Sequence, residues 1–329
     1  MGVFMAEYYI GFDIGGTKCA VVLGKYDNDE MIIADKKAFP TQVEKGFEHT
    51  INNIFTAAKE IIAENNLTND KINAIGISCG GPLDSKKGVI MSPPNLPGWD
   101  DVPIVEMTEK EFGIRTYLQN DANACGVAEW KFGAGKGAEN VIFLTFGTGM
   151  GAGLILGGKL YEGTNGMAGE IGHIRMSDHG PVGYGKEGSF EGFCSGGGIA
   201  QSAKTMVLEK LQKGEKVSFC ESIDALDTIT AKSVAEAAKN GDELAIKIYE
   251  RCGEYLGRGL SVLIDILNPE VIVIGSIYER SSDLLAASMK KTIEREAIGI
   301  SASVCRIAPA ILGDSIGDFA ALAVAVDKQ

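Results

Sequence analysis

The chain has 329 residues, enough for two domains or one large one, and 43 of them are glycine, a share well above the usual ~7%. Because 45% of the residues are hydrophobic, this glycine excess excludes a collagen-like, disordered or low-complexity chain and indicates a globular protein. The formal net charge of −13 disfavours nucleic acids and anionic membranes as partners, since both are bound through basic residues.

The sequence also carries signals about location. No apolar run is long enough for a transmembrane helix, and residues 1–9 lack the basic and apolar regions of a signal peptide. The seven cysteines are odd in number and form no CxxC pair, which is typical of free thiols rather than disulfides. We therefore expect a cytoplasmic protein.

Apolar periodicity predicts the secondary structure. Short runs of β-forming residues predict strands, and apolar residues at i, i+4 and i+7 predict amphipathic helices. The predicted strands lie at 8–12, 19–23, 31–34, 72–77, 115–118, 141–145 and 271–274, with a hairpin at 154–161. The predicted helices lie at 46–64, 105–112, 124–131, 198–211, 231–238, 243–267 and 315–326.

A strand, a glycine-rich turn and a hairpin occur twice, with Asp13 and Thr145 at equivalent corners. A repeated βββαβα unit predicts an α/β fold with two similar domains around a central cleft. We place a smaller N-terminal domain at 1–118, joined by the C-terminal helix at about 314–329. The larger C-terminal domain then covers 119–313.

Both glycine-rich turns suit phosphate groups, because glycine lets consecutive backbone N–H groups approach an anion closely. Either turn alone could be an ordinary hairpin turn, but equivalent places in a repeat favour phosphate binding. The chain has neither a P-loop nor a GxGxxG segment that opens a helix. Asp13 is a candidate to hold Mg²⁺ through water. The candidate phosphate-binding residues are Asp13, Gly15, Gly16, Thr17, Lys18, Gly147, Thr148 and Gly149.

Several polar residues stand where a substrate could bind. Asp121 lies between a predicted strand and helix, where it could be a helix N-cap or a general base. Glu170 and His173 are spaced i, i+3, so a helical turn would place them on one face. Asn95 stands between prolines and could be a turn residue or a ligand contact.

Four motifs in this order resemble the ROK family of sugar kinases and repressors, a branch of the actin/hexokinase/Hsp70 ATPases. They are Asp13-Ile-Gly-Gly-Thr-Lys, Asn120-Asp-Ala-Asn, Gly147-Thr-Gly-Met-Gly and Ala168-Gly-Glu-Ile-Gly-His, and the resemblance extends over residues 8–325. It implies a two-domain actin/hexokinase-like (ribonuclease H-like) fold. It also implies a homodimer whose ligands are a small sugar, ATP and Mg²⁺.

The resemblance implies roles for individual residues. Asp121 would be the general base that takes the proton of a sugar hydroxyl as its oxygen attacks the γ-phosphate of ATP. Gly275 falls at the edge that binds adenosine, where Ser276 replaces the second glycine of the usual pair. The residues that match sugar contacts are Gly81, Asn95, Asn120, Glu170, His173 and Glu191.

The stretches at 95–99 and 161–173 look most like those of ROK glucokinases, and the resemblance implies phosphorylation of the 6-hydroxyl of glucose. Kinases of N-acetylmannosamine, fructose, mannose, allose or β-glucosides remain alternatives, as does a non-catalytic sugar sensor. A ROK repressor would carry a helix-turn-helix, for which the residues before Asp13 leave no room. We therefore expect a hexose kinase.

The zinc motif of the family is altered in this chain. ROK kinases usually hold a structural zinc through the motif histidine, here His173, and three cysteines of a CxCGxxGC segment. Val182, Tyr184 and Ser189 stand in the place of these cysteines. We expect no structural zinc, and we expect apolar packing of Tyr184 and Phe190 to replace it.

Overall fold

The computed structural model describes residues 6–27 and 30–327, so residues 1–5, 28–29 and 328–329 lie outside it. The chain forms two compact units. Unit 1 comprises Met1–Ala138, Gly153–Ala168 and Ile311–Gln329, and unit 2 comprises Glu139–Ala152 and Gly169–Ala310. Residues 119–138, which the sequence assigns to the second domain, pack within unit 1. Across the described ranges, no helix is long and apolar enough to cross a membrane.

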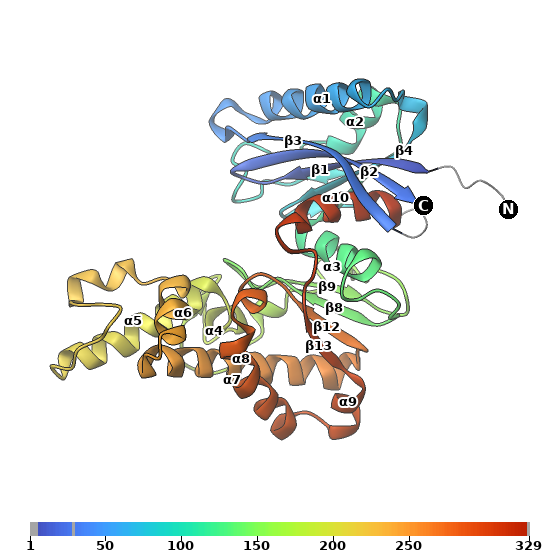
Figure 1. Ribbon diagram of the computed structural model, residues 1–329. Helices are drawn as coiled ribbons and strands as arrows, with labels where there is room; N and C mark the ends of the chain where they lie inside the picture. The colour runs from blue at the N-terminus through green and yellow to red at the C-terminus, as the bar shows by residue number, and fades with distance from the viewer. Residues whose placement is uncertain (1–5, 28–29, 328–329) are drawn as a thin grey trace. The chain divides into compact units, whose positions relative to one another are not determined.

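Unit 1 is built on a five-stranded sheet of order β3-β2-β1-β4-β7. Figure 1 labels the strands β1 to β4 of this sheet. The first three strands form the predicted antiparallel meander, and β4 and β7 run parallel to β1. The strands are β1 (Glu7–Ile14), β2 (Lys18–Asp27), β3 (Glu30–Pro40), β4 (Ile72–Cys79) and β7 (Thr116–Asn120), with a small pair β5 (Leu83–Asp84) and β6 (Val89–Ile90). The helices are α1 (Phe47–Glu64), α2 (Ile104–Phe112), α3 (Asp121–Phe132) and α10 (Ile316–Asp327).

Helices cover both faces of this sheet. On one face, α1 buries Ile51 and Ile54 against β1 residues such as Phe12, as its apolar periodicity predicts. On the other face α10 lies directly on the strands, because a Cβ on Gly76 would stand 2.1 Å from the Ala321 carbonyl oxygen. Glycine is therefore required at that point of β4.

A buried carboxylate fixes the segment that leads into α10. Glu129, in α3, is fully buried, and its Oε1 accepts the N–H groups of Ile311 and Leu312, each at 3.0 Å. Its Oε2 accepts the N–H of Ala134 at 2.7 Å. Three backbone donors thus compensate the loss of water around this charge. They hold a chain segment that is distant in sequence against α3.

Unit 2 contains most of the second sheet, of order β13-β12-β8-β9, with β12 parallel to both β8 and β13. Residues 153–155 of β9 fall in unit 1. This order matches β7-β4-β1-β2 of unit 1, which confirms the predicted duplication. Within the described residues, the third strand of the second meander is reduced to a single bridge between Ile155 and Leu160. The strands are β8 (Val141–Leu144), β9 (Ala152–Ile155), β12 (Val271–Ile274) and β13 (Arg306–Pro309).

The helices of unit 2 include the main omission of the sequence analysis. They are α4 (Phe190–Phe193), α5 (Gly196–Gln212), α6 (Ala231–Lys239), α7 (Glu243–Leu267), α8 (Ile277–Glu296) and α9 (Gly299–Val304). No element was predicted at 277–309, where α8, α9 and β13 lie. The helix α8 is rich in charge and is interrupted at Ser281 (φ −140°, ψ 23°), which blurs its apolar period.

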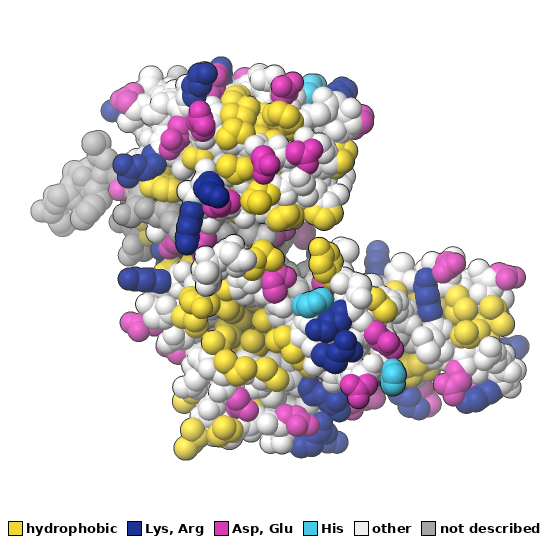
Figure 2. Space-filling view, turned by 180° about the vertical axis from the view of Figure 1, so that it is seen from behind, with side chains coloured by type: hydrophobic (Ala, Val, Ile, Leu, Met, Phe, Trp, Pro, Cys, Tyr) yellow, Lys and Arg dark blue, Asp and Glu magenta, His cyan; other side chains and the backbone are white. Residues whose placement is uncertain are grey.

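The surface carries charges of both signs. On the face drawn in Figure 2, Lys and Arg side chains are interspersed with Asp and Glu side chains and with small apolar areas.

Candidate active site

In unit 1, the predicted site residues follow the carboxyl ends of three neighbouring parallel strands. Ile14 at the end of β1 is paired with Cys79 at the end of β4, and Cys79 is paired with Asn120 at the end of β7. The turns that begin there contain Gly15–Thr17, Gly81 and Asp121. Open α/β sheets bind ligands outside this edge, so the register alone gathers the predicted residues of unit 1.

Glycines let the loops at this edge approach one another. A Cβ on Gly16 would stand 2.3 Å from the Asn95 carbonyl oxygen, and a Cβ on Gly81 would stand 3.1 Å from the Asn120 amide nitrogen. The turn after β1 is closed by the Gly15 N–H, which donates to the Lys18 carbonyl at 3.1 Å. The first glycine turn and the predicted sugar contacts of unit 1 therefore lie together.

Asp121 is the first residue of α3, and it is not the N-cap that the residues alone also allowed. Asn120 is the N-cap, since its Oδ1 accepts the N–H of Ala122 at 3.0 Å. The Oδ1 of Asp121 accepts the same N–H at 2.8 Å. The Asp121 side chain is exposed, yet surrounding protein reduces its solvation and raises the pKa of its carboxyl group. A raised pKa suits a general base.

The sequence analysis missed a network of side chains behind Asp121. Buried Gln119 accepts the Asn120 N–H at 2.8 Å and the Asn123 side-chain amide at 3.1 Å through its Oε1. Its Nε2 donates to Glu162 Oε1 at 2.9 Å, which also accepts the hydroxyl of Ser85 at 2.7 Å. The network orients the start of α3. No local pattern could reveal it, because its members are up to 77 residues apart.

Asp13 lies beside the first turn of α10. A Cβ on Gly317 would stand 2.6 Å from its Oδ2, and the next residue, Asp318, is buried and paired with Lys36. Burial, and then the negative charge of Asp318, raise the pKa of Asp13 to about 6. A carboxylate in such surroundings favours a bound cation. The sequence analysis missed Asp318, since α10 approaches β1 only in the folded chain.

In unit 2, the second glycine turn is closed on itself. The Thr145 N–H donates to the Gly151 carbonyl at 3.0 Å, and the Gly151 N–H donates to the Thr145 hydroxyl at 2.8 Å. Inside this loop, the Gly147 N–H donates to the Gly149 carbonyl at 3.1 Å. Glu191 binds the turn from outside, because its Oε2 accepts the Met150 N–H at 2.9 Å.

The predicted sugar residues of unit 2 adjoin this turn. Glu170 precedes a short 3-10 helix, Ile171–His173, so Glu170 and His173 share one helical turn as predicted. A Cβ on Gly172, in the same turn, would stand 2.2 Å from the Met150 carbonyl oxygen and 3.3 Å from Glu191 Cβ. The structure thus brings Glu170, His173 and Glu191 to the second glycine turn.

The end of β12 borders the same turn. The Gly275 N–H donates to the Leu144 carbonyl at 3.0 Å, and a Cβ on Gly147 would stand 3.4 Å from Ser276 Oγ. Ser276 has φ 60° and ψ −106°, a conformation that favours glycine. The backbone at Ser276 therefore keeps the conformation of a glycine, although serine replaces the second glycine of the family's Gly-Gly pair in this chain.

We expect Ser276→Gly to raise the free energy of unfolding by about 1 kcal/mol. Positive φ at a non-glycine residue costs about 1–3 kcal/mol, and the greater freedom of glycine in the unfolded chain offsets part of the gain. Urea unfolding of the variant and the wild type measures this difference. Ser303→Gly, in α9, is the matched control and should lower stability, since glycine is unfavourable in a helix. If Ser276→Gly were less stable than the wild type, the backbone at Ser276 would not be strained.

The segment that replaces the zinc loop departs from expectation. Tyr184 has φ 44° and a side chain that is 84% exposed, so its predicted apolar packing is wrong. Phe190 is fully buried and packs against α7, where a Cβ on Gly259 would stand 2.2 Å from its ring. Tyr184 is exposed because it lies at the tip of a hairpin rather than under it.

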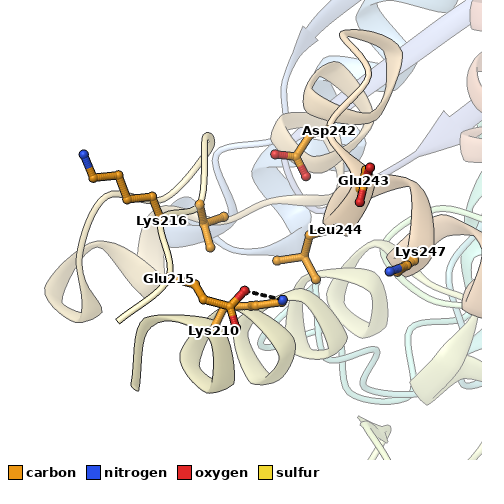
Figure 3. A pocket seen from close by; sticks show the side chains of 8 residues that line it. Lys210, Glu215, Lys216, Asp242, Glu243, Leu244 and Lys247 are labelled. Carbon is orange, nitrogen blue, oxygen red and sulfur yellow. Dashed lines mark hydrogen bonds and ion pairs between the residues drawn. The ribbon is translucent and has the colours of Figure 1, made fainter. Parts of the chain in front are cut away.

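A pocket of about 210 Å³ lies elsewhere in unit 2, between the end of α5 and the start of α7 (Figure 3). Three of its charged side chains, those of Lys210, Glu215 and Asp242, already have partners in the chain. Lys210 is paired with Glu215, and Asp242 accepts the Ala245 N–H at 2.9 Å and the Ser218 hydroxyl at 2.6 Å. The residues of the candidate site do not line this pocket, and it receives no role here.

The sequence and the fold have counterparts among known proteins. The sequence profile described as the ROK family matches residues 9–328. A glucokinase of Halalkalibacterium halodurans is 32% identical over 313 residues, covering 94% of this chain and 92% of the relative. A xylose repressor of Caldicellulosiruptor bescii is 28% identical over 287 residues, covering 87% and 70%.

A similar solved structure is a ROK family glucokinase from Streptomyces griseus in complex with glucose and AMPPNP. It has a TM-score of 0.71 and 28% identity, and the match covers 97% of this chain and 99% of that one. The order of the motifs, the duplicated sheets and these likenesses agree over almost the whole length. The chain belongs to the ROK family of proteins.

Proposed function

We propose that this protein is an ATP-dependent hexose kinase that transfers the γ-phosphate of ATP to the 6-hydroxyl of glucose. The observation that carries the proposal is the alignment of Ile14, Cys79 and Asn120, which gathers the first glycine turn and the Asp121 carboxylate at one sheet edge. Glucokinases at about 30% identity, and a solved relative described with glucose and AMPPNP, support the choice of reaction and substrates.

Asp121 acts in this proposal as the general base. Its carboxylate accepts the proton of the sugar hydroxyl as that oxygen attacks the γ-phosphorus, while ADP leaves. The backbone N–H groups of the two glycine turns, with Thr17 and Lys18, bind the phosphates, and Gly275 adjoins the adenosine. Sugar hydroxyls are held by Gly81, Asn95, Asn120, Glu170, His173 and Glu191.

Asp13 is the residue that would hold Mg²⁺, directly or through water. Its buried carboxylate, with its raised pKa and the neighbouring Asp318, fits a site that gains from a nearby cation. Bound Mg²⁺ neutralises charge on the phosphate oxygens. A homodimer belongs to the same proposal.

A coupled assay of ADP release over a panel of sugars tests the proposal. The panel contains glucose, N-acetylmannosamine, fructose, mannose, allose and a β-glucoside, each with ATP and Mg²⁺. We expect the highest kcat/KM with glucose. A higher kcat/KM with another sugar would support the kinase activity but contradict glucose as the substrate.

The second candidate is a sugar sensor without catalysis, which the similarity to a xylose repressor favours. A sensor would bind a sugar in calorimetry and release no ADP with any member of the panel. That outcome would overturn the kinase proposal.

A further inference from the structure

The chain after His173 folds back as a hairpin. The two-residue strands β10 (Val182–Gly183) and β11 (Lys186–Glu187) pair antiparallel. Tyr184 and Gly185 join them with φ values of 44° and 73°, the pattern of a tight two-residue hairpin turn. This hairpin occupies the segment where the family resemblance implies a zinc loop.

The residues of this segment do not fit zinc. Val182 has no donor atom in its side chain, and the Ser189 hydroxyl is engaged as the N-cap of α4, accepting the Gly192 N–H at 3.1 Å. The buried Cys194 thiol points to the Cys252 carbonyl at 3.5 Å. Across residues 6–27 and 30–327, no three His, Cys, Asp or Glu side chains are grouped to hold a metal ion.

Side-chain hydrogen bonds anchor both strands of the hairpin instead. Lys186, in β11, donates from Nζ to the carbonyl oxygen of His173 at 2.6 Å. Gln201, in α5, accepts the Val182 N–H at 3.0 Å and donates to the Val182 carbonyl at 2.9 Å, so its amide pairs with β10 as a strand would. Arg175 adds a bond from Nη1 to the Glu187 carbonyl at 2.9 Å.

The backbone beside His173 depends on this anchored segment. The N–H groups of Met176 and Ser177 both donate to the Gly188 carbonyl, at 2.8 and 3.1 Å, directly after β11. A continuous chain of contacts thus extends from α5 through Gln201, the hairpin and Lys186 to the carbonyl of His173. Because the ammonium group of Lys186 is charged, its hydrogen bond to the His173 carbonyl is stronger than a hydrogen bond between neutral groups.

We propose that Lys186 and Gln201 are positioning residues, which hold the Glu170–His173 turn through the hairpin in place of a metal ion. The inference rests on the proposed function in one respect, that Glu170 and His173 bind the sugar. Neither positioning residue touches the substrate. Their loss therefore affects the placement of the sugar, and the phosphate turns keep their own hydrogen bonds.

Lys186→Met keeps the aliphatic stem and removes the ammonium group. We expect the KM for the sugar to rise about fivefold, with kcat and the KM for ATP within twofold of the wild type. Lys186→Arg keeps a charged donor and should restore the wild-type KM. Lys232→Met, at an exposed position of α6, is the control and should change none of these constants. Combining Lys186→Met with Gln201→Leu should raise the KM more than tenfold.

Hydrogen–deuterium exchange of the free protein tests the inference without any sugar. Lys186→Met should speed exchange several-fold at the amides of 173–177 and leave those of α7 unchanged. Unchanged exchange at 173–177 would overturn the positioning role, whatever the kinetics. If the wild type phosphorylates no sugar, the proposed function fails, while this exchange result still decides the inference. One zinc ion per chain in elemental analysis of the purified protein would also overturn it.

Discussion

We expect the replacement of Asp121 with alanine to lower kcat by a factor of about 10² to 10⁴, the usual contribution of a general base, which is the role proposed for this carboxylate. The KM for the sugar should stay within about threefold of the wild-type value, because Glu170, His173 and Asn95 remain. Steady-state assays with the best sugar of the panel, supplemented by sugar binding in calorimetry, measure both quantities.

A more conservative substitution, Asp121→Asn, tests the same role. Asp121→Asn keeps the size of the side chain and an oxygen that can accept the Ala122 N–H, but it cannot take a proton. It should be as inactive as the alanine variant. Asp70→Asn, at an exposed site, is the control and should retain wild-type activity. Near-wild-type kcat in either Asp121 variant would show that this carboxylate is not the base.

The pH dependence follows from the raised pKa of Asp121. A base works in its deprotonated form, so kcat/KM should fall as pH decreases through the pKa of this group. Because that pKa is raised, the fall begins at a higher pH than for an ordinary aspartate. The residual activity of Asp121→Asn should lack this limb of the profile.

Asp13→Asn is expected to stabilise the protein while it removes activity. In the folded chain the pKa of Asp13 is about 6, above the ordinary 3.8, because burial and Asp318 disfavour the carboxylate. At pH 7 the wild type therefore carries a charge that the fold opposes. The neutral variant should gain about 2 kcal/mol of unfolding free energy.

The sign of the pH effect distinguishes this explanation from a general packing effect. The Asp13 carboxyl binds its proton more tightly in the folded than in the unfolded chain, so the contribution of Asp13 to stability falls as pH rises from about 4 to 6 and stays lower above 6. The advantage of Asp13→Asn should be full above pH 6 and shrink as pH falls toward 4. Urea unfolding at several pH values measures it.

Activity provides the second half of this prediction. If Asp13 holds Mg²⁺, Asp13→Asn should lower kcat/KM for ATP at least about 100-fold, the cost of a lost charge at the phosphates. Asp70→Asn should change neither stability nor activity appreciably. A variant that is no more stable at pH 7 would contradict the unfavourable environment of the Asp13 charge.

The sequence predicted most of unit 1 and less of unit 2. In unit 1, α1 and α2 were predicted because each has a clear apolar period, and asparagine or glycine follows α1, α2 and α3 directly. In unit 2, α8 was not predicted, because charged residues and the break at Ser281 interrupt its apolar period. The exposure of Tyr184 was not predicted, because it depends on the path of a hairpin. Two adjacent positive φ values in the folded chain define that path.

The sequence alone determined the family, the repeat, the two glycine turns and the general positions of Asp121, Glu170 and His173. These features are local, since they depend on residue type and short spacing. Tertiary structure decided that Asn120 caps α3, that Asp318 stands beside Asp13, and that Lys186 binds the carbonyl of His173. Two of these contacts join different elements, and the third depends on how β7 enters α3. Packing and strand register, rather than any pattern along the chain, determine such contacts.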